Sequence, residues 1–250
     1  MNMQSKVVIG LGANWNGEEQ IKDRVHLTVM RAPIDNEMFM KKDWYVFENK
    51  NFWKNEAEGF DRMMNKCYSC TAQGNTIRVS NALSGVGRMP FLRYTVDYSF
   101  FEDGSVKVTL NGDVREDCTW LPRLGFEFRT PYDKDRFRYF GRGEMENYCD
   151  MNAHAKIGFY ESDADSEYVP YIMPQEHGNH TDAKFLEMKD GMKFTTDGKF
   201  EFNVSHYSAD TLMRATHINE LKKEEATIIR IDYKNSGVGS DSCGHRLLEQ

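Results

Sequence analysis

The sequence is poor in cysteine and proline and has no long run of apolar residues. It contains 5 cysteines and 6 prolines among its 250 residues. Five cysteines are an odd number and too few for a disulfide scaffold, so we expect reduced thiols. No stretch approaches the roughly 20 apolar residues that a membrane-spanning helix needs. The N-terminus carries no evident targeting segment, and with reduced thiols this favours a cytoplasmic location.

An excess of positive charge is also missing. Lys and Arg together number 32 against 39 Asp and Glu, which gives a net charge of −7. Nucleic-acid-binding proteins usually cluster Lys and Arg without interleaved acids. We therefore expect no nucleic acid and no membrane as partner, and a neutral ligand is the better match to this composition.

Two short motifs invite a metal or redox interpretation that the rest of the sequence does not support. Cys67 and Cys70 form a C-x-x-C, but no second pair or βαβ context accompanies it, so we expect both side chains to pack in the interior. His177 and His180 are three residues apart in a loop, and no third ligand is evident. The sequence predicts neither a metal nor another cofactor.

A possible dinucleotide motif begins at Val7, where three apolar residues precede Gly10 and Gly12. Trp15 occupies the position of the third glycine of the dinucleotide-binding fingerprint, and its bulk would block close packing of helix on strand. No alternation of strands and helices follows. We interpret residues 1–24 as an N-terminal edge strand or linker.

Most of the chain has the two-residue alternation of apolar and polar side chains that is typical of half-buried strands. This pattern covers residues 93–100, 106–110, 123–129 and 200–205. Glu102, Asp103 and Gly104 form a turn between the first two segments, which predicts a hairpin with one buried face. Helical spacing predicts an interrupted helix over 51–66 with its Met and Phe residues in the core, and Ser208 is the expected N-cap of a short helix that ends near His217.

Residues 137–150 contain the most distinctive pattern. Aromatic residues alternate with Arg138 and then give way to a glycine-flanked turn that holds Glu144, Glu146 and Asn147. Two carboxylates at i and i+2 of an extended segment lie roughly 7 Å apart, a separation that glycoside chemistry can use. Such a turn is nonetheless typical of a hydrogen-bonded structural loop.

This stretch resembles the Gly-Arg-Gly-x-x-Glu-Asn-Tyr-x-Asp signature in the C-terminal domain of glycoside hydrolase family 2 β-galactosidases. Further segments resemble motifs of the same domain and occur in the same order. They are Arg-Ala-Pro-Ile-Asp-Asn at 31–36, Ala-Glu-Gly at 57–59, Pro-Tyr-Ile-Met-Pro-Gln-Glu-His-Gly at 170–178, Tyr-Ser and Thr-His at 207–208 and 216–217, and a glycine-rich loop at 237–244. From the residues alone, the segment at 31–36 is an ion-paired turn in which Arg31, Asp35 and Asn36 surround a proline.

The resemblance implies an all-β fold over residues 25–250, namely a large antiparallel supersandwich that is galactose mutarotase-like and has a few short helices. It also implies that the last strand or strands of that domain are missing here. Family members carry both catalytic carboxylates on a separate (β/α)₈ barrel of roughly 250 residues, for which this chain has no room. The resemblance thus implies a non-catalytic domain of a retaining β-galactosidase, with a barrel domain and a galactoside as partners and a homo-oligomeric parent enzyme.

The resemblance also names residues that would face the carbohydrate, and none that would be catalytic. They are Gly59, Arg142, Glu146, Asn147, Asp241, Ser242 and Cys243. Cys243 stands where some members place a tryptophan platform, and a thiol cannot stack on a sugar ring. Two other functions stay open. One is a mutarotase-like enzyme that uses His177 with Glu146 or Glu176, and the other is a carbohydrate-binding module.

Overall fold

The computed structural model describes residues 3–9, 14–15, 18–19, 21–22, 25–37, 58–118 and 120–239. The chain forms two compact units, one from Met1–Leu11 and Phe39–Trp120 and the other from Gly12–Met38 and Leu121–Gln250. Strands make up nearly all of the regular structure in the described residues, which confirms the predicted all-β class with a few short helices. No helix in the described part of the chain is long and apolar enough to cross a membrane. The domain boundary expected at residue 24 stays a prediction.

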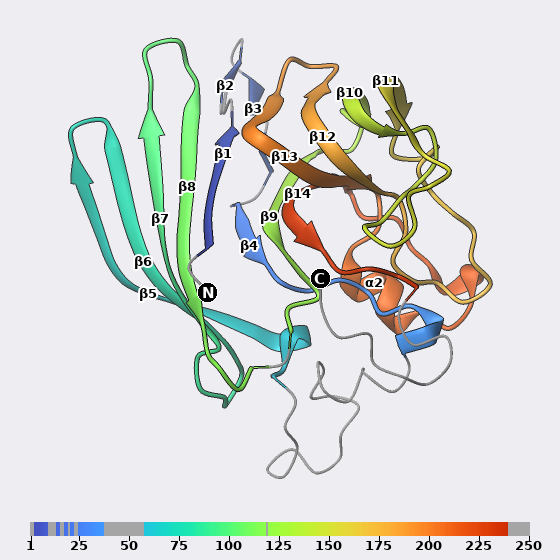
Figure 1. The fold of residues 1–250 in the computed structure, drawn as a ribbon, viewed down its shortest axis with the longest axis horizontal. Coiled ribbons are helices and arrows are strands. Elements are labelled where there is room, and N and C mark those ends of the chain that lie inside the picture. The colour runs from blue at the N-terminus through green and yellow to red at the C-terminus, as the bar shows by residue number, and fades with distance from the viewer. Residues whose placement is uncertain are drawn as a thin grey trace. The chain divides into compact units, whose positions relative to one another are not determined.

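The first unit is an antiparallel meander (Figure 1). Its strands are β1 (Met3–Ile9), β5 (Met63–Gln73), β6 (Thr76–Gly85), β7 (Leu92–Phe100) and β8 (Val106–Val114). They pair in the order β1, β8, β7, β6, β5. The strand predicted near Val7 is therefore present as β1. The predicted hairpin is β7 with β8, and its buried face includes Tyr94, Val96 and Val108.

The predicted helix over 51–66 is wrong where the structure describes it, since 51–57 lie outside the described residues. A 3₁₀ turn, η2 (Phe60–Arg62), leads directly into β5, which pairs with β6 from Met63 to Gln73. This ladder supplies the backbone hydrogen bonds and overrides the local spacing. Phe60 is buried against Phe91 as expected, with ring centroids 5.0 Å apart. Met64 is 56% exposed, so its assignment to the core is wrong.

The expected packing of the C-x-x-C motif is also wrong. Cys67 and Cys70 lie on β5, and both are free thiols at the surface. Most residues of β5 are exposed, whichever face of the strand they occupy. The motif therefore sits on a strand that the described residues cover on neither side.

The second unit contains a larger antiparallel sheet. Its strands are β4 (His26–Thr28), β9 (Arg123–Pro131), β10 (Arg136–Gly143), β11 (Lys156–Asp163), β12 (Asn179–Met188), β13 (Lys193–Ser205) and β14 (Ala226–Asn235). They pair in the order β11, β10, β12, β13, β14, β9, β4. The strands predicted at 123–129 and 200–205 are parts of β9 and β13. A separate two-stranded ribbon is formed by β2 (Asn14–Trp15) and β3 (Glu18–Glu19).

Short helices connect the strands of this unit. They are η1 (Asp35–Glu37), α2 (Ala209–Arg214) and η3 (Ile218–Glu220). Ser208 caps α2 as predicted, since its hydroxyl accepts the backbone N–H of Thr211 at 3.1 Å. The helix ends at Arg214, earlier than expected, and His217 precedes η3 instead.

Where β13, β14 and β9 pair, both faces of this sheet are buried, which decides where its polar residues lie. One face is apolar, and Phe202 of β13, Ile231 of β14 and Phe126 of β9 lie opposite one another across it. The opposite face carries Glu201, Asn203, Arg230 and Asp232 on the neighbouring positions of β13 and β14, and all four are buried. Apolar residues thus alternate with buried polar residues along these strands. The polar residues form a network inside the protein.

Candidate functional site

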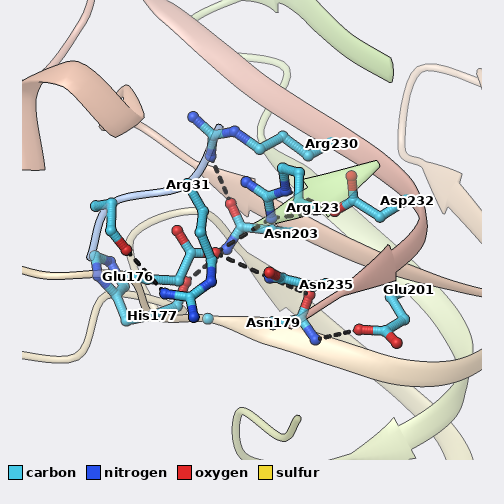
Figure 2. Close-up of polar contacts among 12 residues, drawn as sticks. Arg31, Arg123, Glu176, His177, Asn179, Glu201, Asn203, Arg230, Asp232 and Asn235 are labelled. Atoms are coloured by element: carbon cyan, nitrogen blue, oxygen red, sulfur yellow. Dashed lines mark hydrogen bonds and ion pairs between the residues drawn. The ribbon is translucent and has the colours of Figure 1, made fainter. Parts of the chain in front are cut away.

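Arg230 of β14 is the centre of one row of that polar face (Figure 2). Its guanidinium donates to Asn203 Oδ1 on β13 at 2.8 Å and to Glu127 Oε2 on β9 at 3.0 Å. It also donates to the carbonyl of Tyr207 at 3.2 Å. Charged groups can be buried when hydrogen bonds of this kind satisfy them. The row fixes three adjacent strands relative to one another.

Arg123 of β9 joins a strand to a loop in the same face. Its Nε donates to Asp232 Oδ2 at 3.1 Å and its Nη2 donates to Glu176 Oε1 at 3.2 Å, and all three side chains are almost fully buried. Burial acts to raise the pKa of Glu176, but Arg123, Arg230 and Arg31 outweigh it and lower that pKa. Burial raises the pKa of Asp232 to about 6, because Arg123 offsets it only in part.

Asp232 has room beside β9 because the opposite residue is Gly125. A Cβ atom at Gly125 would lie 1.9 Å from Asp232 Oδ1, well inside contact distance. Glycine is thus required at this position by the close approach of a buried carboxylate, and not by its backbone angles. Any larger residue would push Asp232 away from Arg123.

Asn179 and Glu201 extend the network toward the end of β14. Asn179 Nδ2 donates to Glu201 Oε2 at 3.0 Å, and Asn235 Nδ2 donates to Glu176 Oε1 at 3.2 Å. Burial, with the nearby Asp232, raises the pKa of Glu201 to about 7 despite the hydrogen bond from Asn179. Glu201 therefore holds a proton at a pH where most carboxyl groups are ionised.

Arg31 connects the first motif to this network. Its two terminal nitrogens reach both oxygens of Glu37, at 2.8 and 2.5 Å. The turn is ion-paired as predicted, but the acid is Glu37, one residue beyond the motif, instead of the expected Asp35. Asp35 uses its backbone N–H to reach Gln175 Oε1 at 2.8 Å. The motifs at 31–36 and 170–178 are therefore in direct contact.

The same arginine also holds the beginning of the glycine-rich loop. Arg31 donates to Ser236 Oγ at 2.9 Å and to the carbonyl of Gly237 at 3.1 Å. On the other side, the Asp150 carboxylate accepts the backbone N–H groups of Val238 and Gly239 at 3.0 and 2.8 Å. A Cβ atom at Gly237 would lie 2.2 Å from Asp150 Oδ2, so a larger residue here would displace the Asp150 carboxylate.

Residues 236–239 are thus fixed by two segments that are far apart in the sequence. Arg31 belongs to the first motif and Asp150 ends the signature that begins at Gly141. The side chain of Asp150 is exposed and its two bonds to the loop are charge-assisted. The base of the predicted carbohydrate-facing loop is the point where these motifs meet.

Three of the predicted carbohydrate-facing residues, Arg142, Glu146 and Asn147, lie around the turn after β10. Glu146 accepts the N–H of Gly178 at 2.7 Å and the hydroxyl of Tyr171, and it is buried. Asn147 is fully buried, and its Oδ1 accepts both the N–H and the hydroxyl of Thr181. The structure brings these two residues together with Arg142, whose Nε donates to Asp182 Oδ2 at 2.5 Å. Their observed contacts hold the turn after β10 against β12.

Gly59 belongs to the other compact unit, where it precedes η2 with a φ of 78° that suits glycine. Asp241, Ser242 and Cys243 lie outside the described residues. The roles expected for these residues stay predictions.

A buried Tyr–His–Glu array that the sequence analysis did not identify lies beside the turn after β10. His180 Nε2 contacts Glu167 Oε2 at 2.7 Å, and Tyr139 OH lies 3.1 Å from His180 Nδ1. Tyr139 and Glu167 also line a pocket of about 520 Å³, together with Tyr160 and several carboxylates. His180 is 13 residues from Glu167 and 41 residues from Tyr139, and no motif links the three, so only the fold could reveal the array. Among the described residues no group of three or more His, Cys, Asp or Glu side chains is arranged to hold a metal ion.

The comparison with protein families agrees with the motifs. The family model of the β-galactosidase small chain matches residues 8–250. The chain belongs to the β-galactosidase small-chain family. This confirms the family that the motifs at 31–36, 141–150 and 170–178 resemble.

Similar curated proteins carry the name β-galactosidase. One from Actinobacillus pleuropneumoniae is 29% identical over 238 residues, which cover 94% of this chain and 22% of the relative. Those from Staphylococcus xylosus and Streptococcus thermophilus are each 30% identical, and the match covers 88% and 92% of this chain and 22% of each relative. The small-chain domain thus spans about a fifth of the length of these relatives.

Proposed function

We propose that this small-chain domain is the non-catalytic part of a retaining β-galactosidase, in which it completes the galactoside site and the assembly. The observation that carries this proposal is the anchoring of residues 236–239 by Arg31 and Asp150. A loop fixed at its base by charge-assisted hydrogen bonds can present residues 240–244 to a neighbouring domain at low entropic cost. Asp241, Ser242 and Cys243 are the residues that we assign to the sugar.

The contacts of Glu146 and Glu176, the two glutamates of the mutarotase-like alternative, support a non-catalytic role. Glycoside hydrolysis needs two carboxyl groups that flank a bound sugar, one of them free to transfer a proton. Glu146 already accepts from Gly178 and Tyr171, and Glu176 accepts from Arg123 and Asn235. His177 is buried as well, and its Nδ1 donates to the carbonyl of Gln175. Among the described residues no hydrogen bond joins His177 to Glu146 or Glu176, so the mutarotase-like pairing has no direct contact behind it.

An aromatic row that is exposed at Phe159 and half-buried at Phe140 and Phe185 supports the part of the proposal that concerns assembly. Phe159 of β11 lies opposite Phe140 of β10, which lies opposite Phe185 of β12. The ring centroids are 4.7 Å apart for Phe140 and Phe159, and Phe159 is 76% exposed. Contiguous exposed apolar surface is typical of an interface. We assign this face to the contact with the rest of the enzyme. The relatives are about five times as long as the matched segment, which leaves room for that remaining part.

The test is reconstitution of activity from two parts. The purified chain alone should not hydrolyse a chromogenic β-galactoside, and hydrolysis should appear when it is mixed with the separately purified catalytic portion. F159S should raise the chain concentration needed for half-maximal activity by more than about tenfold, because truncation of a central aromatic anchor is costly. F101S, which removes an exposed phenylalanine from a hairpin tip of the other unit, is the matched control.

Three outcomes would contradict parts of the proposal. Turnover by the chain alone that disappears in the E146Q variant would place a catalytic carboxylate in this domain. Full activity of the catalytic portion without the chain would remove the role in completing the site. An equal effect of F159S and F101S would remove the assignment of the aromatic row.

Removal of the loop anchor should affect catalysis without unfolding the domain. In the assembled enzyme, D150A should lower kcat/KM for a galactoside by about tenfold or more, because the N–H groups of Val238 and Gly239 lose their acceptor and the loop loses its position. Thermal unfolding of the chain should change little, because Asp150 is exposed. Steady-state kinetics and a melting curve measure both. A large loss of stability with unchanged kcat/KM would show that Asp150 only supports the fold.

A further inference from the structure

The exposed C-x-x-C motif of β5 has a geometry that its sequence does not suggest. In a regular strand, residues three positions apart point to opposite faces. Here a β-bulge interrupts β5 between Cys67 and Ser69. Cys67 lies opposite Asn81 on β6, and Cys70 lies opposite Val79.

The bulge therefore brings the two thiols to one face. Asn81 and Val79 are two residues apart on a regular strand, so they share a face, and their cross-strand partners Cys67 and Cys70 share it with them. Tyr68 is the extra residue that the bulge accommodates, and its side chain is 51% exposed. Both cysteines are free and exposed, so a reagent from solution can reach the two sulfur atoms together.

The spacing distinguishes between two uses of such a pair. Two positions along a strand separate Cα atoms by about 7 Å, which is at the upper limit for a disulfide, whose usual Cα separation is about 5.5–6 Å. An ion held at about 2.3 Å from each sulfur lets the sulfurs stand up to about 4.6 Å apart, against about 2.05 Å for an S–S bond. A bridging ion fits this spacing better than a direct bond between the sulfurs.

We propose that Cys67 and Cys70 form a two-thiolate clamp for a thiophilic ion such as trivalent arsenic. Thiolates are soft ligands and select soft ions over the hard cations that carboxylates bind. With a monosubstituted arsenic(III) oxide, two As–S bonds form and the As–O bond is lost. Both thiol protons leave with the oxide oxygen as one water molecule, and no electron is transferred.

Phenylarsine oxide and intact-mass spectrometry test the clamp on the full chain. The experiment uses a C118S/C149S/C243S background, in which Cys67 and Cys70 are the only thiols. One arsenical per chain should remain bound in excess 2-mercaptoethanol, because a monothiol competes poorly with an attachment through two sulfurs. A dithiol should remove it. C67S and C70S should each lower retention at least tenfold.

A matched variant separates shared-face geometry from mere proximity in sequence. Ser69 lies opposite Ser80, on the other face of β5. The double substitution S69C/C70S keeps two exposed thiols, closer in sequence than before, but places them on opposite faces. It should lose retention at least tenfold, while circular dichroism confirms that each variant is folded.

Three results would overturn the clamp. The first is loss of the arsenical from the parent background in excess monothiol. The second is retention by S69C/C70S equal to that of the parent. The third is a Cys67–Cys70 disulfide formed in the folded protein by oxidised dithiothreitol, since that product would show that the sulfurs meet directly.

Discussion

Substitution of Arg123 by methionine is expected to destabilise the small-chain domain by about 3–5 kcal/mol. Methionine fills similar space, but it leaves Asp232 and Glu176 buried without their shared cation. Their side chains are almost fully buried, so water cannot replace the guanidinium. A loss of this size is a large part of the stability of an ordinary domain, and R123M should be partly unfolded at 37 °C. Urea denaturation followed by circular dichroism measures the change.

Two further variants show whether the buried charges are the cause. R138M removes an arginine that is 60% exposed and pairs with Glu187 at the surface, and it should cost less than about 1 kcal/mol. R123M/E176Q/D232N removes the cation together with both carboxylates and should recover more than half of the loss. A triple variant as unstable as R123M would mean that packing by the Arg123 side chain, and not its charge, is what the network needs.

The strands were predictable because alternation records which side chains face an apolar core. Phe126 and Phe128 of β9, and Phe200 and Phe202 of β13, are buried where the pattern places them. The same pattern cannot tell whether the other face meets water or protein. Asn203 and Arg230 have the composition of a solvent face, yet both are buried and bonded to each other at 2.8 Å. Only the pairing of β14 with β13 and β9 shows that these polar side chains bond to one another inside the protein.

The errors of the sequence analysis have a related cause. Met63 and Met64 have helical spacing with Phe60, but pairing with β6 fixes an extended backbone, and residues adjacent in a strand point to opposite sides. Met64 consequently lies in solvent. The position of Cys67 and Cys70 on one face depends on a bulge, which no short-range pattern in this segment indicates.

The candidate site was predictable as a set of motifs but not as a geometry. The motifs indicated the family and named the segments, and the family model that matches residues 8–250 confirms that part. The contact of Arg31 with Gly237 joins residues 206 positions apart, and its acid partner Glu37 stands just outside the motif. Contacts at such separations follow from strand order, which sequence spacing does not determine.

Glu201 should make the domain less stable as the pH rises above the range in which ordinary carboxyl groups titrate. Burial raises its pKa to about 7 in the folded chain, against about 4.3 for an unfolded glutamate. Between these two values the folded state binds more protons than the unfolded state, so the free energy of unfolding decreases with increasing pH and levels off above the folded pKa. Asn179, Asp232, Arg123 and the backbone of Asn235 are the groups that act on this carboxyl.

E201Q isolates this contribution because glutamine keeps an oxygen for Asn179 Nδ2 and cannot ionise. The difference in unfolding free energy between E201Q and the parent chain should grow in favour of E201Q by on the order of 2–3 kcal/mol from pH 5 to pH 8. Asp232, with a pKa of about 6, is present in both proteins, so its own titration largely cancels in the difference. Urea denaturation at pH 5, 6, 7 and 8 gives the comparison. A difference that stays constant over this range would mean that Glu201 does not change its protonation there. The conclusion that the Glu201 carboxyl is neutral beside Asn179 would then be wrong.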